Sequence, residues 1–328
     1  MTVIEIAAIG PVPWACMLLV QMGATVVRID RPGPPPSADP MRAGRTVVEL
    51  DLKTSTGRDS LLERLRAADA LVEGMRPGVM ERLGLGPADC KAVNPRLVYG
   101  RMTGWGQNGP LAPRAGHDIN YIALTGALHA IGPASQPCPP LNLIGDYGGG
   151  GCFLAMGVLA ALLAARRGAP GCVVDAAMID GTAALMALAY GRLADGRWRD
   201  EREANMLDGG APWYRSYATA DGRFVAVGAI EPPFYEAFIR GLGLDLQALP
   251  DREQRDNWPA LHRRFADVLR TRTRDEWTSV FEDTDACVTP VLSMAEAPLH
   301  AHHKARRTFV ATPQGHALPG PAPRFLPA

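Results

Sequence analysis

Three ionisable residues stand in contexts that are typical of catalytic loops. They are His117 in GHDINY, Asp146 in NLIGDYGGGG and Glu231 in VGAIEPPFY, and each lies near Gly, Pro or an aromatic residue. Catalytic groups concentrate in loops that a rigid scaffold holds in place. A histidine and two carboxylates can transfer protons as general acids and bases. Each residue could equally be a capping or turn residue, so the three are candidates for catalysis.

The run of glycines after Asp146 has two interpretations. An acidic residue is favoured at the start of a helix by the helix dipole, so Asp146 could simply open the apolar helix that follows. The glycines could instead let a ligand carbonyl or phosphate approach the backbone closely. No Lys-Ser/Thr pair follows the run, and no GxGxxG motif follows the first predicted strand. The pattern therefore gives no support to P-loop hydrolysis or to hydride transfer.

Several arginines fall at or just after predicted strand ends, at the edge where open parallel sheets bind ligands. They include Arg28 in VVRIDR, and Arg76 and Arg82 in RPGVMERLGLG. Arginine suits phosphates and carboxylates, so local phosphate binding is one interpretation. Ordinary surface charge is the other.

Three histidines, His300, His302 and His303, lie close together in LHAHHKARR. Zinc sites combine histidines with one another or with thiol or carboxylate ligands at recurring spacings. These three have basic neighbours and no thiol or acidic ligand beside them. The segment is typical of a solvated basic loop, and no metal site is predicted.

Overall charge and composition limit the function classes. The 328 residues contain 34 Lys plus Arg and 34 Asp plus Glu, so no global field attracts nucleic acid or an anionic membrane. The six cysteines form no CxxC pair, and the start of the chain lacks the basic region of a signal peptide. The longest apolar run, Cys152 to Ala165, is shorter than the ~20 residues that span a bilayer and predicts a buried helix. We therefore expect a cytoplasmic protein without nucleic-acid or membrane partners.

The elements that must position these residues alternate in type along the first third of the chain. Strands are predicted at Thr2 to Ala7, Thr25 to Asp30, Thr46 to Leu52, Ala70 to Glu73 and Leu97 to Met102, and helices near Trp14 to Met22 and Gly57 to Ala67. This alternation is typical of a parallel sheet with crossover helices. The proline-rich segment Arg31 to Pro40 predicts a surface loop, and GDYGGGG predicts a flexible turn.

A second domain is expected after about Leu193, where the composition of the sequence changes. The segment with an Asp221-Gly222 turn predicts a β-hairpin, and helical patterns follow it. We place a large domain at residues 1–190, a small domain at 205–300 and a Pro/Gly-rich tail at 301–328.

Six long strings carry a resemblance to a known family. They are IGPVPWACMLLVQMGATVVRIDRP, EGMRPGVMERLGLG, GRMTGWGQNGPL, GHDINYIALTGAL, PLNLIGDYGGGG and VGAIEPPFYEAF. Together they resemble the α-methylacyl-CoA racemases of the class III CoA-transferase superfamily, over almost the whole chain. The resemblance implies an α/β fold: a Rossmann-like parallel-sheet large domain plus a smaller α+β domain, in an interlocked, ring-like homodimer. It also implies that the tail returns to the large domain.

The resemblance implies inversion of 2-methylacyl-CoA thioesters by α-proton abstraction and reprotonation through an enolate. His117 would act on one face of the α-carbon and Asp146 on the other. Glu231 would hydrogen-bond to His117, reaching it across the dimer interface. Backbone amides around Asp118 would hold the enolate oxygen. CoA is part of the substrate, so no separate cofactor is expected.

Binding residues are implied in the same way. Arg28, Arg76 and Arg82 would grip the CoA phosphates, and Asn142 and Tyr214 would shape the acyl end.

Two other functions remain open. A class III CoA-transferase would use Asp146 as a nucleophile, although such enzymes usually carry an aromatic residue where His117 stands. The HDINY and Glu-Pro-Pro-Phe strings match the racemase pattern and favour racemisation. A catalytically idle acyl-CoA-binding protein would bind thioesters without exchanging their α-protons.

Overall fold

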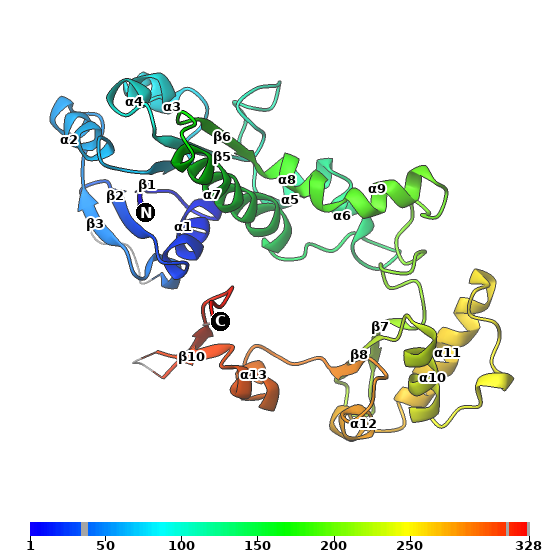
Figure 1. Cartoon of the computed structure of the whole chain (residues 1–328). Helices are drawn as coiled ribbons and strands as arrows, with labels where there is room; N and C mark the ends of the chain where they lie inside the picture. Colours follow the sequence, from blue (N-terminus) through cyan, green and yellow to red (C-terminus); the bar gives the residue numbers. More distant parts are fainter. Residues whose placement is uncertain (34–38, 313–314, 327–328) are drawn as a thin grey trace. The chain divides into compact units, whose positions relative to one another are not determined.

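Figure 1 shows the computed structural model of the chain, which describes residues 1–33, 39–312 and 315–326. The chain forms two compact units. Within the described ranges, unit 1 comprises residues 1–128, 139–191 and 321–326, and unit 2 comprises residues 129–138 and 192–320. Part of the loop predicted at Arg31 to Pro40 lies outside the described residues.

These units differ from the predicted domains in two places. Residues 129–138 group with unit 2, where Arg202 donates hydrogen bonds to the carbonyl oxygens of His129, Pro133 and Ala134 at 3.0–3.1 Å. The predicted tail divides, because residues 301–320 group with unit 2 and residues 321–326 with unit 1.

Unit 1 is built on a six-stranded parallel sheet in the order β3-β2-β1-β4-β5-β6. The strands are β1 (Thr2–Ile6), β2 (Thr25–Asp30), β3 (Thr46–Glu49), β4 (Ala70–Glu73), β5 (Val98–Thr103) and β6 (Val173–Ala177). Val3 of β1 pairs with Val26 on one side and Ala70 on the other. The predicted α/β class and the parallel sheet are confirmed.

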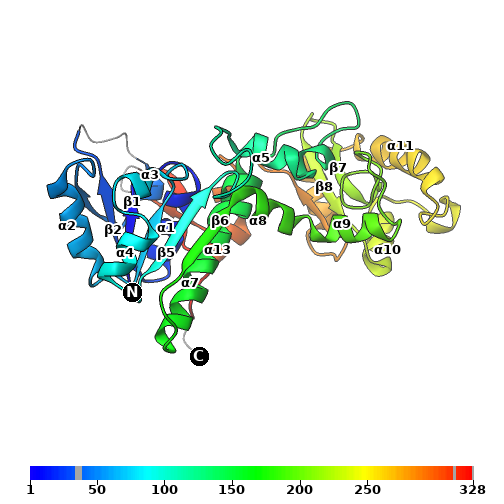
Figure 2. The same ribbon diagram turned by 90° about the horizontal axis from the view of Figure 1, so that it is seen from above.

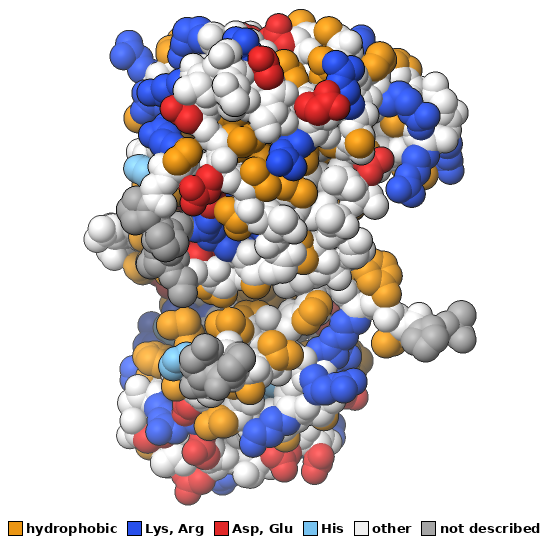
Figure 3. All heavy atoms as spheres, turned by 90° about the vertical axis from the view of Figure 1, so that its left-hand side faces the viewer, with side chains coloured by type: hydrophobic (Ala, Val, Ile, Leu, Met, Phe, Trp, Pro, Cys, Tyr) orange, Lys and Arg blue, Asp and Glu red, His pale blue; other side chains and the backbone are white. Residues whose placement is uncertain are grey.

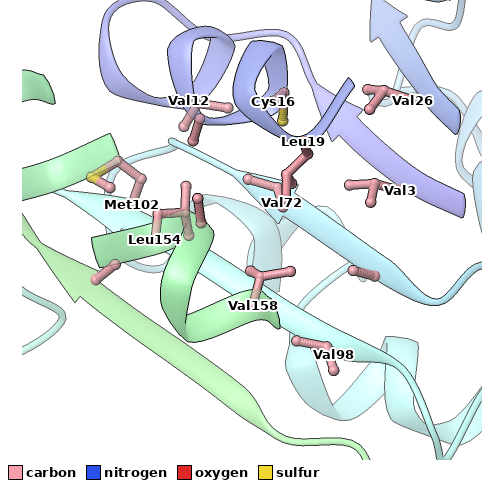
Figure 4. Close-up of a cluster of buried hydrophobic side chains, with 14 of the residues drawn as sticks. Val3, Val12, Cys16, Leu19, Val26, Val72, Val98, Met102, Leu154 and Val158 are labelled. Atoms are coloured by element: carbon pink, nitrogen blue, oxygen red, sulfur yellow. The ribbon is translucent and has the colours of Figure 1, made fainter. Parts of the chain in front are cut away.

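Helices cover both faces of this sheet (Figure 2). One face carries α1 (Pro11–Gln21) and α7 (Phe153–Arg166), and the other carries α2 (Ser55–Leu65), α3 (Val79–Arg82) and α4 (Pro87–Val93). In Figure 4, Leu19 of α1 and Val158 of α7 lie over the strand residues Val3, Val72 and Val98. Successive side chains of a strand point to opposite faces, so a strand covered on both faces buries all of its side chains, as β4 does.

The glycine run is helical, so the predicted flexible turn is wrong. Residues Leu143–Cys152 form a π-helix, η2, that continues directly into α7. The glycines permit close packing: a Cβ at Gly149 would lie 2.6 Å from Thr182 Oγ1, and one at Gly151 would lie 2.5 Å from the Trp14 ring. Here glycine removes side-chain bulk between packed helices, and the packing offsets its poor helix propensity.

This continuation also changes the expected length of the apolar helix. Within the described residues, Leu143–Arg166 is long and apolar enough to cross a membrane by length and composition alone. Its most apolar window is 44% buried inside the protein, and Leu154, Val158 and Leu162 belong to the core beside the sheet. The prediction of a helix packed in the core is confirmed, whereas its predicted length was too short.

Four further helices belong to this part of the chain. They are α5 (Asp118–Leu124), α6 (Ala127–Ala130), α8 (Met178–Leu185) and α9 (Ala187–Ala194). The buried side chain of Ile122 on α5 and that of Thr182 on α8 lie against the glycines of η2. The π-helix η2 therefore packs against both α5 and α8.

Unit 2 contains a three-stranded antiparallel sheet in the order β7-β8-β9. Its elements are β7 (Tyr214–Ala218), β8 (Phe224–Gly228), β9 (Val288–Pro290), α10 (Pro232–Gly241), α11 (Trp258–Leu269) and α12 (Arg274–Phe281). The β7–β8 hairpin turns at Gly222, whose φ of 73° suits glycine, so the predicted hairpin is confirmed. Phe238, Phe265 and Trp277 fill the core.

The tail is more ordered than predicted. It contains α13 (Ala301–Arg306) and an antiparallel hairpin of β10 (Phe309–Ala311) and β11 (Ala317–Pro319).

On the face drawn in Figure 3, basic and acidic side chains are mixed among neutral ones. That mixture agrees with the equal numbers of the two kinds of charge in the sequence.

Candidate active site

A cavity of about 370 Å³ opens at the carboxyl edge of the parallel sheet. It is lined by the segments that follow β1, β4 and β5, together with His117, Tyr121, Asp146 and Met178. Strands β1 and β4 are neighbours whose chains continue in opposite directions across the sheet, through β2 and β5 respectively. Ligands of open parallel sheets bind at such a switch point. The topology therefore places a ligand site where the candidate residues gather.

Asp146 lies in the first turn of η2 and is half-buried beside the β1–α1 loop. Asn142 Nδ2 donates a hydrogen bond to Asp146 Oδ2 at 3.1 Å. Gly10, with a φ of 69°, brings the loop so close that a Cβ there would lie 3.4 Å from the same oxygen. The carboxylate thus sits against backbone on one side and faces the cavity.

The environment of Asp146 favours its protonated form. Burial raises the pKa of the Asp146 carboxyl above its ordinary value, and the negative charge of Asp118 adds to the rise. The hydrogen bond from Asn142 and the nearby His117 partly oppose it by lowering the pKa. A carboxyl group shifted in this direction is a stronger base when ionised and holds a proton closer to neutral pH.

His117 lies at the N-cap position of α5, and its side chain is exposed. Its backbone N–H donates to Asn120 Oδ1 at 3.0 Å, which fixes the start of the helix. The preceding residue, Gly116, is held by Tyr121, whose hydroxyl donates to the Gly116 carbonyl oxygen at 2.5 Å. The imidazole is therefore presented to the cavity by a fixed backbone. His117 and Asp146, predicted as a pair, line the same cavity.

Asp118 connects the two candidate catalytic residues. Its buried carboxylate accepts a hydrogen bond from the Asp146 backbone N–H at 2.7 Å, which ties the start of α5 to η2. The other carboxylate oxygen, Oδ1, is buried without a hydrogen-bond partner among the described atoms. Within the same described set, the backbone N–H groups of Asp118 and Ile119 also have none, as is usual in a first helical turn. Backbone amides around Asp118 were expected to hold an enolate oxygen, and that role stays a prediction.

Aromatic packing supports the wall of the cavity. The Trp105 and Tyr121 rings meet edge to face with centroids 4.7 Å apart. A Cβ at Gly104 would lie 2.1 Å from the Tyr121 ring, and one at Gly116 would lie 2.8 Å from it. The two glycines therefore make room for the tyrosine that anchors the loop before His117.

The three predicted phosphate-binding arginines lie in different environments. Arg76 is exposed and lines the cavity, whereas Arg82, also exposed, ends α3 and does not line it. Arg28 is buried, and its guanidinium forms ion pairs with Glu5 and, at 2.9 Å, with Asp30. In the described structure Arg28 is committed to these carboxylates, which makes it a structural residue of the sheet. Phosphate binding by Arg28, Arg76 and Arg82 stays a prediction.

Asn142, Tyr214 and Glu231 complete the predicted set. Asn142 contacts Asp146 as described above. Tyr214 begins β7 and is half-buried, and Glu231 is the exposed N-cap residue of α10. The last two belong to unit 2, so their roles at the cavity of unit 1 stay predictions.

Some residues that line the cavity were not predicted from the sequence. Arg114 lines the cavity beside Ala115, and the loop Ile9 to Val12 forms part of its wall. The signal for that loop was available, since it follows the first strand of a parallel sheet, where ligand loops are expected. Arg114 lies in an irregular Gly/Pro-rich passage, where no periodic pattern indicates which side chains face inward.

Comparisons with known proteins support the fold and identify the family. The chain is 44% identical over 326 residues to α-methylacyl-CoA racemase from Homo sapiens, covering 99% of this chain and 85% of that protein. It is 35% identical to a CaiB/baiF CoA-transferase family protein from Caenorhabditis elegans, covering 98% of this chain and 93% of that one.

Solved structures show the same fold. A CAIB/BAIF family protein from Brucella suis matches with a TM-score of 0.82 at 23% identity, covering 99% of this chain and 91% of that chain. A hypothetical protein from Mycobacterium tuberculosis matches with a TM-score of 0.82 at 24% identity, covering 99% and 92%. The sequence profile described as CoA-transferase family III matches residues 1–328. This match spans the whole chain, and the human relative is 44% identical over 99% of this chain. The chain therefore belongs to CoA-transferase family III.

Proposed function

We propose that this protein is an α-methylacyl-CoA racemase, which inverts the carbon next to the thioester carbonyl of 2-methylacyl-CoA substrates. The observation that carries the proposal is the shared cavity of His117 and Asp146, an imidazole and a carboxylate of raised pKa. The identity to the human and mouse racemases, 44% in each case, supports the choice of substrate class.

The reaction needs one group on each face of the α-carbon. A base removes the α-proton, and the electron pair of the broken C–H bond moves toward the thioester oxygen to form an enolate. A conjugate acid on the opposite face then donates a proton to the α-carbon, and the thioester carbonyl re-forms. No atom is gained or lost. In one direction Asp146 is the base and His117 the acid, and in the other direction their roles are exchanged.

The enolate oxygen needs hydrogen-bond donors, because side-chain bases alone are too weak for a thioester α-proton. The N–H groups of Asp118 and Ile119 are free for this purpose within the described structure. Loss of one such donor typically costs ~3–4 kcal/mol of transition-state stabilisation. The proposed mechanism assigns these donors to the same short helix that begins after His117.

The proposal includes a homodimer in which Glu231 of one subunit hydrogen-bonds to His117 of the other and sets its tautomer. It further includes action in the cytoplasm without a separate cofactor. Exposure of both Glu231 and His117 is compatible with a contact of this kind.

A CoA-transferase is the second candidate function, and one observation favours it. Asp146 lines the cavity, and a carboxylate in that position could attack a thioester. Relatives of lower identity carry transferase names, such as acetyl-CoA:oxalate CoA-transferase from Acetobacter aceti at 28%. Transfer would require a free carboxylic acid as acceptor, and racemisation would not.

Incubation of one enantiomer of a 2-methylacyl-CoA in deuterium oxide separates the two functions. The purified protein is tested with and without an added carboxylic acid, and α-deuterium content and stereochemistry are followed. The racemase proposal requires deuterium incorporation with inversion in the absence of acceptor. Acceptor-dependent formation of a new acyl-CoA without α-exchange would instead identify a transferase.

A further inference from the structure

Unit 2 contains a second cavity, of about 410 Å³, whose lining residues all belong to that unit. We refer to it as the unit 2 cavity. Three arginines line it, Arg199, Arg215 and Arg255, and Glu203 is the one carboxylate in the described lining. The formal charge of these four side chains leaves two guanidinium groups without a counter-charge. An excess of this kind at a concave surface attracts anions.

Two of the arginines have no acidic partner. The exposed Arg199 side chain makes no hydrogen bond or ion pair within the described structure. Arg255 donates from Nη1 to the Ala204 carbonyl oxygen at 3.2 Å and from Nη2 to the Arg197 carbonyl oxygen at 3.1 Å. Carbonyl oxygens orient a guanidinium group without neutralising it. Arg255 is thus a cation held by two carbonyl oxygens, and Arg199 is a cation without a side-chain hydrogen bond in the described structure.

Arg215 is the most enclosed of the three. Its Nη2 contacts Glu203 Oε1 at 3.3 Å and its Nη1 donates to the Gly209 carbonyl oxygen at 2.9 Å. Its Nε is buried without a partner among the described atoms. Since a buried unpaired donor is unfavourable, an acceptor that reached this group would form a favourable hydrogen bond.

The remaining wall is apolar and aromatic. Trp258 and Pro259 line the cavity at the start of α11, and the Arg255 guanidinium lies 5.4 Å from the centre of the Trp258 ring. His262, on the same helix, also lines it. Burial lowers the pKa of His262, and the charge of Arg215 lowers it further, so the imidazole favours its neutral form. A neutral imidazole can donate one hydrogen bond to an anion.

We propose that the unit 2 cavity binds a small organic phosphate, with the phosphoryl group among Arg199, Arg215 and Arg255 and the organic part against Trp258. A carboxylate is satisfied by one guanidinium fork, whereas a phosphate dianion can accept from several donors and balances two charges. The volume lies within the range of small-molecule sites and exceeds what an inorganic anion requires. This site is independent of the proposed racemase reaction.

The test measures binding of phenyl phosphate and of benzoate to the full-length protein by titration calorimetry. Both probes carry one aromatic ring, so they differ in the anionic group. Phenyl phosphate should bind at least about tenfold more tightly than benzoate. Arg199→Gln should weaken phenyl phosphate binding by about tenfold or more, the loss expected for one charge-assisted hydrogen bond.

Two controls separate this site from other causes. Arg240→Gln removes an exposed arginine of α10 that does not line the cavity, and binding should stay at the wild-type value. Arg76→Gln acts at the cavity of unit 1 and should also leave the tighter phenyl phosphate site unchanged.

Three results would overturn the proposal: no binding of phenyl phosphate, equal affinity for benzoate, or loss of binding in Arg76→Gln but not in Arg199→Gln. The Arg199 side chain makes no hydrogen bond or ion pair within the described structure, and a substitution keeps the backbone contacts of residue 199 with Asn205. Its replacement should therefore leave the melting temperature of the free protein unchanged. A second variant, Arg199→Glu, places a carboxylate among the remaining arginines and should abolish binding.

Discussion

The carboxylate of Asp118 offers a direct test of how the active site is positioned. It accepts the Asp146 N–H at 2.7 Å, and its charge raises the pKa of Asp146. Asp118→Ala removes both effects, whereas Asp118→Asn keeps an oxygen acceptor and removes only the charge. A hydrogen bond to a charged group contributes ~1.5–3 kcal/mol, and ~1.4 kcal/mol corresponds to a factor of ten. We therefore expect Asp118→Ala to lower kcat by about 10- to 100-fold with little change in KM.

The pH dependence of Asp118→Asn gives a second readout. A neighbouring negative charge disfavours ionisation of Asp146 and raises its pKa, so removal of that charge lowers the pKa. Asp146 then stays ionised to lower pH. In the direction in which Asp146 is the base, the acid limb of kcat/KM should move to lower pH, while kcat at the optimum stays close to that of the wild type.

The assay is α-deuterium exchange of each enantiomer across the pH range, with far-UV circular dichroism to verify folding. Asp180→Asn is the matched control, because Asp180 is an exposed acidic residue in the first turn of α8 that does not line the cavity. Wild-type kcat in Asp118→Ala would refute the positioning role. An acid limb that does not move in Asp118→Asn, or that moves equally in Asp180→Asn, would refute the electrostatic role.

Four other substitutions examine separate parts of the molecule. His117→Ala should slow α-exchange by about 10²- to 10⁴-fold, the range for loss of a general acid or base, and full exchange would contradict the mechanism. Gly181→Ala should lower the free energy of unfolding in urea by about 3 kcal/mol, because its Cβ would lie 1.9 Å from a π-helix carbonyl oxygen. Gly191→Ala on α9 meets nothing within 4 Å and should raise that free energy by about 0.5–1 kcal/mol, so a similar loss in both variants would contradict the packing argument. Hydrogen bonds from Arg274 lower the pKa of Glu296 from 4.5 to about 2. The stability that Glu296 provides should be present above pH 4.5 and be lost as the pH falls toward 2, and Glu296→Gln should remove this dependence from acid-unfolding curves.

Strands of the large sheet could be predicted because most are short runs rich in β-branched and other apolar residues, with single charged residues among them. Thr25–Asp30 and Ala70–Glu73 have the predicted bounds, and β1 ends one residue before the predicted end. Both faces of these strands are covered, so their amino-acid composition alone indicates that they are buried. Their order in the sheet depends on which faces the crossover helices occupy, and that information is not local.

Glycine was the main source of error. In a single sequence, four consecutive glycines after Asp146 predict flexibility, since glycine carries the largest entropic cost on ordering. The structure orders them because Thr182, Met178 and Trp14 approach too closely for any side chain. Such contacts join residues far apart in the chain, so no local pattern could indicate them.

The candidate site was partly predictable for a related reason. His117 is the N-cap residue of α5 and Asp146 lies in the first turn of η2, and their sequence contexts mark them as candidates individually. What joins them is the bond from the Asp146 backbone to Asp118, 28 positions earlier, and the sequence suggested only a backbone role for Asp118. Arg28 shows the opposite case, because a basic residue near a strand end proved to be an internal ion-pair partner of Glu5.

The opposing influences on Asp146 bear on the choice between proton transfer and nucleophilic attack. A nucleophile gains from being fully ionised at neutral pH, whereas a group that must both accept and return a proton gains from a pKa raised toward the working pH. Burial moves the pKa of Asp146 upward, and Asn142 and His117 limit the rise. A partner that can accept the next proton, His117, lines the same cavity. This balance suits a carboxyl group that exchanges protons in both directions, and it gives a physical reason to prefer racemisation over acyl transfer.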